Sequence, residues 1–417
     1  MTLAPVRKAR AERLRPRSRA ALHRDSTAQA RRLAASNGVW LEDPGFGVYL
    51  HIPFCATRCH YCDFNTYEGQ GALHSAYVDA LTNHIAAARF GRGPASSVFF
   101  GGGTPTLLPA RQLGGLLDAV RDRIGCDPDA EITVEANPET VDEAKFEALL
   151  DAGFNRFSVG LQSAVPQVLR GLGRTHAPET ALNALRAARR AGVRNLNADV
   201  IYGSPWERAG DWLRTLDAVI EEGPDHISAY ALTVEEATPL ATLVASGRVA
   251  DVDPDVQAER YLIANERFRE AGYARYEISN WARPGAACRH NVLYWSGGNY
   301  AGFGAGAHGH LDGYRWWNLR LPRDFIAAAT RRAPVEAGSE VLDRDARAGE
   351  ALTLGLRLAS GIDLAGFRRR FGAESLAQRS SCLAGLESLG VVERDAGWLR
   401  LSENSLLVAS DIACRLL

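Results

Sequence analysis

The sequence has little of what would indicate a membrane, secreted or nucleic-acid-binding protein. Its 417 residues contain no apolar run of about 18 residues, so no membrane-spanning helix is expected. The seven cysteines are an odd number in a chain with no secretory signal, which argues against a disulfide scaffold. A net charge of −1 argues against general binding of nucleic acid. Met1 is the only methionine, which excludes a thioether metal ligand from the folded body.

Basic charge is concentrated at the N-terminus. The first 36 residues carry ten Lys and Arg side chains against Glu12 and Asp25, and they lack the apolar stretch of a secretory signal. We expect residues 1–44 to form a basic, disordered extension of a cytoplasmic protein. An Arg-rich, acid-poor segment is also typical of a transit peptide, which would direct the chain to the mitochondrial matrix instead.

From residue 45 to 272, short apolar runs alternate with helical patterns. The expected strands are 48–52, 97–100, 131–135, 156–161, 196–201 and 226–232. This alternation predicts an α/β fold, a partial (β/α)6 barrel with its functional residues at the carboxyl ends of the strands.

Two further regions follow the expected barrel. Residues 273–338 are rich in Gly, Asn, Trp and Tyr and predict strands and loops that pack against it. Residues 339–417 combine three helical stretches with a short strand pair, which predicts a winged-helix-like α+β domain. That shape alone does not indicate DNA binding, and we expect no nucleic-acid partner.

Three cysteines lie close together directly after the first expected strand. Cys55, Cys59 and Cys62 have the spacing C-x3-C-x2-C. Three thiolates suit an iron–sulfur cluster with one iron left open. A zinc site would need a fourth ligand, such as His60 or a distant residue, and three unrelated cysteines are the remaining alternative.

This triplet resembles that of the radical S-adenosylmethionine superfamily. YLHIPFC at 49–55, GGGTPT at 101–106 and HNVLYW at 290–295 are similar to the oxygen-independent coproporphyrinogen III oxidase family, and most similar to its heme chaperone branch, HemW. The resemblance covers residues 45–417. It implies a radical-SAM barrel with a [4Fe-4S] cluster on the three cysteines. It also implies S-adenosylmethionine on the open iron, cleaved with the help of an electron donor.

The same resemblance assigns a cofactor pocket to the ends of successive strands. Glycines there allow close backbone approach, and a carboxylate can accept hydrogen bonds from ribose. A buried Asp199 would need a partner, for which Arg174 is a candidate. Taken singly, these residues also fit tight turns, helix caps or ion pairs. The assigned cofactor residues are Tyr49, Tyr61, Gly102, Gly103, Thr104, Glu135, Gln162, Arg174 and Asp199.

Phe64 distinguishes the two branches of the family. The oxidase branch has a further cysteine at this position, so Phe64 disfavours decarboxylation of coproporphyrinogen III to protoporphyrinogen IX. The chaperone branch implies heme binding through H-N-x-x-Y-W, with His290 as the first candidate ligand and Cys288 and His308 behind it. A packed aromatic cluster is the alternative interpretation of this segment. We therefore expect a heme chaperone that serves recipient hemoproteins; a homodimer is compatible with the sequence.

Overall fold

The computed structural model describes residues 34–417, and a single 12-stranded sheet is its central feature. Its strands are β1 (Phe46–Ile52), β4 (Ala95–Gly102), β5 (Cys126–Ala136), β6 (Arg156–Gln162), β7 (Leu196–Tyr202), β8 (His226–Ala231), β9 (Ala274–Glu277), β10 (Asn280–Ala282), β11 (Asn299–Phe303), β12 (His308–Leu311), β13 (Tyr314–Asn318) and β14 (Glu336–Val341). Their order is β14-β13-β12-β11-β1-β4-β5-β6-β7-β8-β10-β9. The run from β11 through β8 is parallel, and the strands outside it pair antiparallel.

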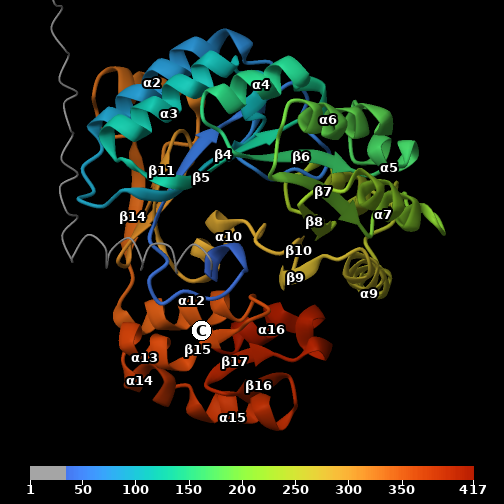
Figure 1. The fold of residues 1–417 in the computed structure, drawn as a ribbon, viewed down its shortest axis with the longest axis vertical. Coiled ribbons are helices and arrows are strands. Elements are labelled where there is room, and N and C mark those ends of the chain that lie inside the picture. The colour runs from blue at the N-terminus through green and yellow to red at the C-terminus, as the bar shows by residue number, and fades with distance from the viewer. Residues whose placement is uncertain (1–33) are drawn as a thin grey trace, which may run out of the picture.

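The six predicted βα strands are confirmed as neighbours β1, β4, β5, β6, β7 and β8. Helices follow them, and α2, α3, α4 and α6 lie side by side along one side of the sheet (Figure 1). The sheet is open, with β14 and β9 as its edges. The helices of this part are α2 (His74–Ala87), α3 (Ala110–Arg123), α4 (Glu143–Asp151), α5 (Pro166–Gly171), α6 (Pro178–Arg190), α7 (Asp211–Glu222), α8 (Pro239–Ala245), α9 (Pro254–Glu270), α10 (Arg289–Trp295) and α11 (Pro322–Thr330).

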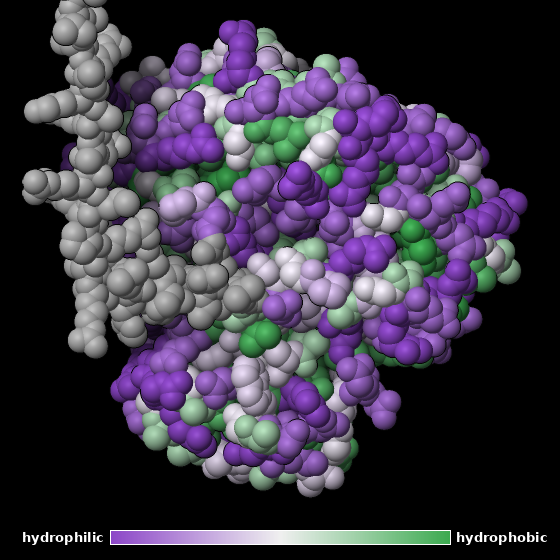
Figure 2. Space-filling view, viewed as in Figure 1, coloured by the Kyte–Doolittle hydropathy of each residue, from purple (hydrophilic) through white to green (hydrophobic). Residues whose placement is uncertain are grey.

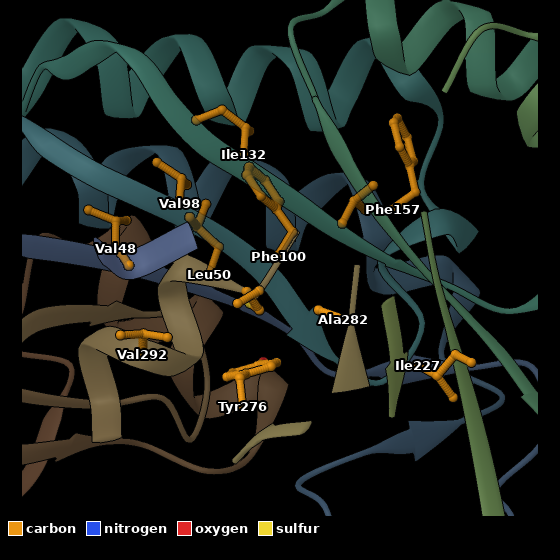
Figure 3. Packing of buried hydrophobic residues seen from close by; sticks show 14 of the residues in the cluster. Val48, Leu50, Val98, Phe100, Ile132, Phe157, Ile227, Tyr276, Ala282 and Val292 are labelled. Atoms are coloured by element: carbon orange, nitrogen blue, oxygen red, sulfur yellow. The ribbon is translucent and has the colours of Figure 1, made fainter. Parts of the chain in front are cut away.

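The core follows from the apolar character of the parallel strands. In β1 every residue but Tyr49 is buried, as expected for a strand covered on both faces. Val48 lies opposite Val98, and Leu50 lies opposite Phe100, and all four are fully buried. Figure 3 shows these side chains packed on neighbouring strands. Burial of each such side chain stabilises the fold by roughly 1.5–3 kcal/mol.

The predicted region 273–338 differs from expectation, because its strands join the sheet instead of lying against it. β10 pairs antiparallel with β8, and β11 pairs parallel with β1, so this region extends both sides of the six-stranded part. Without this region, β1 and β8 would be edge strands with unpaired backbone N–H and C=O groups. Strands β11 and β10 satisfy those groups. Helix α10 lies between the sheet and the C-terminal unit (Figure 1).

The expected boundary of the N-terminal extension at residue 44 was wrong. Trp40 and Leu41 are buried, and the backbone N–H of Leu41 donates to Ser296 Oγ at 3.1 Å. Their apolar side chains gain more from packing than from solvent, so the ordered chain begins before residue 44. The rest of the extension, with the transit-peptide hypothesis, lies in residues 1–33, outside the described residues.

The C-terminal unit has helices around a small sheet, as the winged-helix-like prediction requires. Its sheet has the order β15-β17-β16. Figure 2 shows a mostly hydrophilic face over both parts of the molecule, with apolar residues in separate small groups. No helix within residues 34–417 is long and apolar enough to cross a bilayer. The elements are α12 (Arg344–Gly355), β15 (Ile362–Asp363), α13 (Leu364–Phe371), α14 (Ala373–Ala377), α15 (Ser380–Ser388), β16 (Val392–Asp395), β17 (Trp398–Leu401) and α16 (Ala409–Cys414).

A candidate cofactor site at the carboxyl ends of the strands

The cysteine triplet lies on a closed loop after β1. Strands β2 (Phe54–Cys55) and β3 (Tyr67–Glu68) pair in parallel and join the two ends of this loop. Arg58 donates from its guanidinium to the carbonyl of Cys62 at 3.1 Å, which holds the loop from within. All three thiols line one open cavity of about 340 Å³, called here the thiol cavity.

The structure brings most of the predicted cofactor residues to this cavity. They lie on the cysteine loop after β1, within the carboxyl-terminal half of β4, β5, β6 and β7, and on the loops that follow, where α/β proteins of this kind bind ligands. Tyr49 lies instead on a neighbouring cavity, and His290 lines neither. The predicted residues that line the thiol cavity with the cysteines are Tyr61, Gly102, Gly103, Thr104, Glu135, Gln162, Arg174 and Asp199.

The donor set fits an iron–sulfur cluster, because three cysteine thiols line one cavity and a structural zinc ion would need a fourth ligand. Among residues 34–417, no three His, Cys, Asp or Glu side chains converge closely enough to hold one metal ion. A [4Fe-4S] cluster takes one thiolate on each of several irons, so its ligands surround a cage, whereas structural zinc draws four ligands onto one ion. His60 pairs its Nδ1 with the carbonyl of Gly171 at 3.0 Å and does not line the thiol cavity.

Polar neighbours surround the sulfur atoms. Thr104 directs its hydroxyl to Cys55 Sγ at 3.9 Å, and Arg174 donates to Cys59 Sγ at 3.4 Å. Burial raises the pKa of Cys55 to about 11, so its thiol keeps its proton until a metal displaces it.

Two carboxylates face the cavity. Glu135 accepts a hydrogen bond from the N–H of Gly102 at 3.1 Å, and burial together with Asp199 raises the pKa of Glu135 to about 7. Asp199 accepts from Ser158 and from Asn197, both at 2.8 Å. The expected partnership of Asp199 with Arg174 was wrong, because neutral donors satisfy this carboxylate: Ser158 from the neighbouring strand β6 and Asn197 from the same strand, β7.

Backbone geometry directs two cavity residues. Gln162 has φ +66° at a register shift between β6 and β7, and this irregularity turns its side chain toward the cavity. Gly102 has φ +114°, and a Cβ there would lie 2.5 Å from the His51 ring. The glycine is therefore required by local packing, whatever the cavity binds.

A second cavity of about 800 Å³ lies against the first and is called here the aromatic cavity. Phe64, Gly102 and Glu135 belong to both walls. Phe64 is 63% exposed, which is unusual for a phenylalanine and leaves its ring open to both spaces. The remaining lining residues are Tyr49, His51, Asn65, Tyr294, Tyr300, Gly306, Ala307, His308, Trp317, Asn318 and Arg320.

The first two candidates for a heme ligand are buried away from this cavity. His290 pairs Nδ1 with Ser97 Oγ at 2.8 Å and Nε2 with Tyr294 OH at 2.9 Å, so both ring nitrogens are engaged. Cys288 is also buried, and burial raises the pKa of its thiol to about 12. The geometry disfavours both as iron ligands and leaves His308, the third candidate, which lines the aromatic cavity.

Sequence reasoning did not identify some lining residues. Ser158 alternates with Gly160 and Gln162 along one strand, so a period of two could have shown that they share a face. Trp317 and Arg320 gave no such signal, because their place depends on strands that join the sheet from a distant part of the chain.

Comparison with known proteins agrees with this arrangement. Residues 49–219 match the Radical SAM superfamily, and residues 342–408 match the HemN C-terminal domain. The chain is 45% identical over 347 residues to a protein of Mycobacterium tuberculosis named heme chaperone HemW, covering 81% of this chain and 87% of the relative. The protein of that name from Synechocystis is 35% identical, covering 86% and 88%. The structure of coproporphyrinogen III oxidase HemN from Escherichia coli has the same fold, with a TM-score of 0.76, 24% identity and 93% coverage of each chain.

Proposed function

Because the chain belongs to the HemW family of heme chaperones within the radical SAM superfamily, we propose that it binds heme and delivers it to recipient hemoproteins. One observation carries this proposal. A large aromatic cavity lies directly against the thiol cavity, and their shared wall includes Phe64 at the position where the oxidase branch has a cysteine. This arrangement offers a flat apolar ligand a place beside the cofactors.

We infer that Cys55, Cys59 and Cys62 hold a [4Fe-4S] cluster that leaves one iron open for S-adenosylmethionine. Bound there, S-adenosylmethionine supplies radical chemistry on reduction by an electron donor. The chain's own residues orient the ligand. Glu135 is kept in place by the N–H of Gly102 and offers its second oxygen to a hydroxyl donor.

In this proposal, the other polar residues of the thiol cavity orient the ligand or cover the sulfur atoms. Ser158 and Asn197 fix Asp199 so that its carboxylate is oriented before a ligand arrives. Gln162 contributes an amide that both donates and accepts. Thr104 and Arg174 screen the sulfur atoms from the rest of the cavity. Tyr61 is a half-buried ring of the cluster loop that lines the cavity, and Gly103 lets the backbone pack against Phe54, because a Cβ there would lie 2.5 Å from the Phe54 carbonyl.

In the same proposal, Tyr49 offers its hydroxyl oxygen to a ligand in the neighbouring aromatic cavity. Its hydroxyl lies 2.9 Å from His51 Nδ1, while His51 Nε2 lies 2.9 Å from the carbonyl of Asn65. Since that carbonyl can only accept, Nε2 carries the hydrogen and Nδ1 accepts from Tyr49. The lone pairs of the Tyr49 oxygen therefore remain available toward the aromatic cavity that this residue lines.

The bacterial relatives support a cytoplasmic site of action.

The experiment that tests this function is anaerobic reconstitution followed by heme titration. We expect about four irons and four sulfides per chain, as a [4Fe-4S] centre requires. The triple variant C55S/C59S/C62S should lose both. The wild type should also bind hemin, with a saturating Soret difference spectrum. A colourless protein that retains zinc, or a cluster-loaded protein that binds no hemin, would contradict the proposal.

A further inference from the structure

Among residues 34–417, one histidine that lines the aromatic cavity, His308, makes no hydrogen bond through either ring nitrogen. In His51, His290 and His310, both ring nitrogens lie 2.8–3.2 Å from a hydrogen-bonding partner. Within the described part of the chain, no hydrogen bond engages either ring nitrogen of His308. Its side chain is exposed and lines the cavity, so its nitrogens are open to a ligand there.

The walls around His308 suit a flat aromatic molecule. His308 and Trp317 lie opposite each other on the β12–β13 hairpin, with ring centroids 6.1 Å apart and planes at 31°. Tyr49, Phe64 and Tyr300 add further rings to the same cavity. Aromatic side chains pack well against the face or edge of a planar ligand. The cavity volume of about 800 Å³ falls within the range of roughly 300–1,000 Å³ typical of ligand sites.

The charges at the cavity suit an anionic ligand with a metal. Arg320 is an exposed lining residue, and a guanidinium can bind a carboxylate through two parallel hydrogen bonds. Partial desolvation by the cavity walls, together with the charges of Arg315 and Arg320, lowers the pKa of His308 below its ordinary value of 6.5. The imidazole is therefore neutral at pH 7 and keeps the lone pair that a metal ion requires.

We propose that the aromatic cavity is the heme site, that His308 is the axial ligand of the heme iron, and that Arg320 pairs with a heme propionate. This inference rests on the proposed function. The iron–nitrogen bond forms by donation of the lone pair of a neutral imidazole, so the step releases no proton and transfers no electron. Histidine is a common protein ligand of heme iron.

The test is an anaerobic titration of the full-length, cluster-loaded protein with hemin and, separately, with metal-free protoporphyrin IX. His308→Ala should weaken hemin binding about tenfold or more and shift the Soret band. The affinity for metal-free protoporphyrin should change little, because that probe has no iron to bind. His310→Ala is the matched control, since this nearby histidine lies on the same hairpin with both nitrogens engaged, and it should keep the wild-type hemin spectrum.

A second variant separates ligation from packing. Added imidazole should restore the wild-type Soret position in His308→Gly, because free imidazole can enter the space left by the side chain. If His308→Ala binds hemin with the wild-type affinity and spectrum, the ligand assignment is overturned while the proposed function stands. Equal losses for hemin and metal-free protoporphyrin would also overturn it. If the wild type binds no hemin, the proposed function itself fails.

Discussion

Glu135 lies on the wall shared by both cavities, and burial together with Asp199 raises its pKa from 4.5 to about 7. The folded protein thus retains a proton that the unfolded chain loses. The resulting stabilisation is complete below pH 4.5 and is lost as the pH rises through 7. Glu135→Gln, which cannot ionise, should therefore gain stability relative to wild type between pH 5 and pH 8, on the order of 1–2 kcal/mol.

Urea unfolding of the cluster-free protein at both pH values measures this difference. Glu340→Gln is the control, because Glu340 forms an exposed ion pair with Arg315. That variant should differ from wild type by about 0–1 kcal/mol at both pH values. A gain for Glu135→Gln that does not change with pH would contradict the raised pKa.

Gly102 illustrates a residue that the backbone requires. Its φ of +114° and the 2.5 Å separation between an added Cβ and the His51 ring both exclude a side chain. Gly102→Ala should lower the free energy of unfolding by about 2–4 kcal/mol. Gly115→Ala in α3, where no atom lies within 4 Å of the added Cβ, should be neutral or stabilising by about 0.5–1 kcal/mol. Chemical denaturation measures both values, and equal changes in the free energy of unfolding for Gly102→Ala and Gly115→Ala would contradict this account.

At the scale of elements, helix α10 depends on a buried carboxylate at its N-terminus. Glu131 accepts from the N–H groups of Arg289 and His290 at 3.1 and 3.0 Å. A negative charge there favours the helix dipole and satisfies otherwise free donors. Glu131→Gln should therefore cost about 1–3 kcal/mol of stability, since the amide turns one acceptor into a donor.

The control is an exposed glutamate in the first turn of a different helix. Glu143 begins α4 and pairs with Arg190 on the surface. Glu143→Gln should cost about 0–1 kcal/mol in the same unfolding measurement. If both variants lost the same stability, burial of Glu131 would not be the cause.

At the scale of the whole molecule, residues 34–44 contact both the part built on the 12-stranded sheet and the C-terminal unit. Trp40 is buried beside Gly355 and Gly366 of that unit, and its backbone N–H donates to Ser360 Oγ at 3.2 Å. Trp40→Ala should cost about 3–5 kcal/mol, because a cavity opens where the indole was. Leu389→Ala, at a position 68% exposed, should change the unfolding midpoint little. Similar midpoints for the two variants would contradict this packing.

The sequence allowed much of this organisation to be predicted, for reasons that are local. Short apolar runs and helical patterns lie within short windows of sequence, so the six βα units could be predicted locally. The cysteine spacing and the polar residues at the strand ends could also be recognised from short stretches of sequence. Three features could not be predicted from local sequence: the partners of Asp199, the hydrogen bonds of the His290 ring and the burial of Trp40. They depend on contacts between segments far apart in the chain.

The central claim is that this chain carries heme and does not make protoporphyrinogen. The most direct measurement offers one anaerobic, cluster-loaded preparation hemin in one cuvette and, in another, coproporphyrinogen III with S-adenosylmethionine and a reductant. The account predicts saturable hemin binding and no protoporphyrinogen above the level given by the C55S/C59S/C62S variant. Repeated turnover of coproporphyrinogen III to protoporphyrinogen IX, without hemin binding, would contradict it.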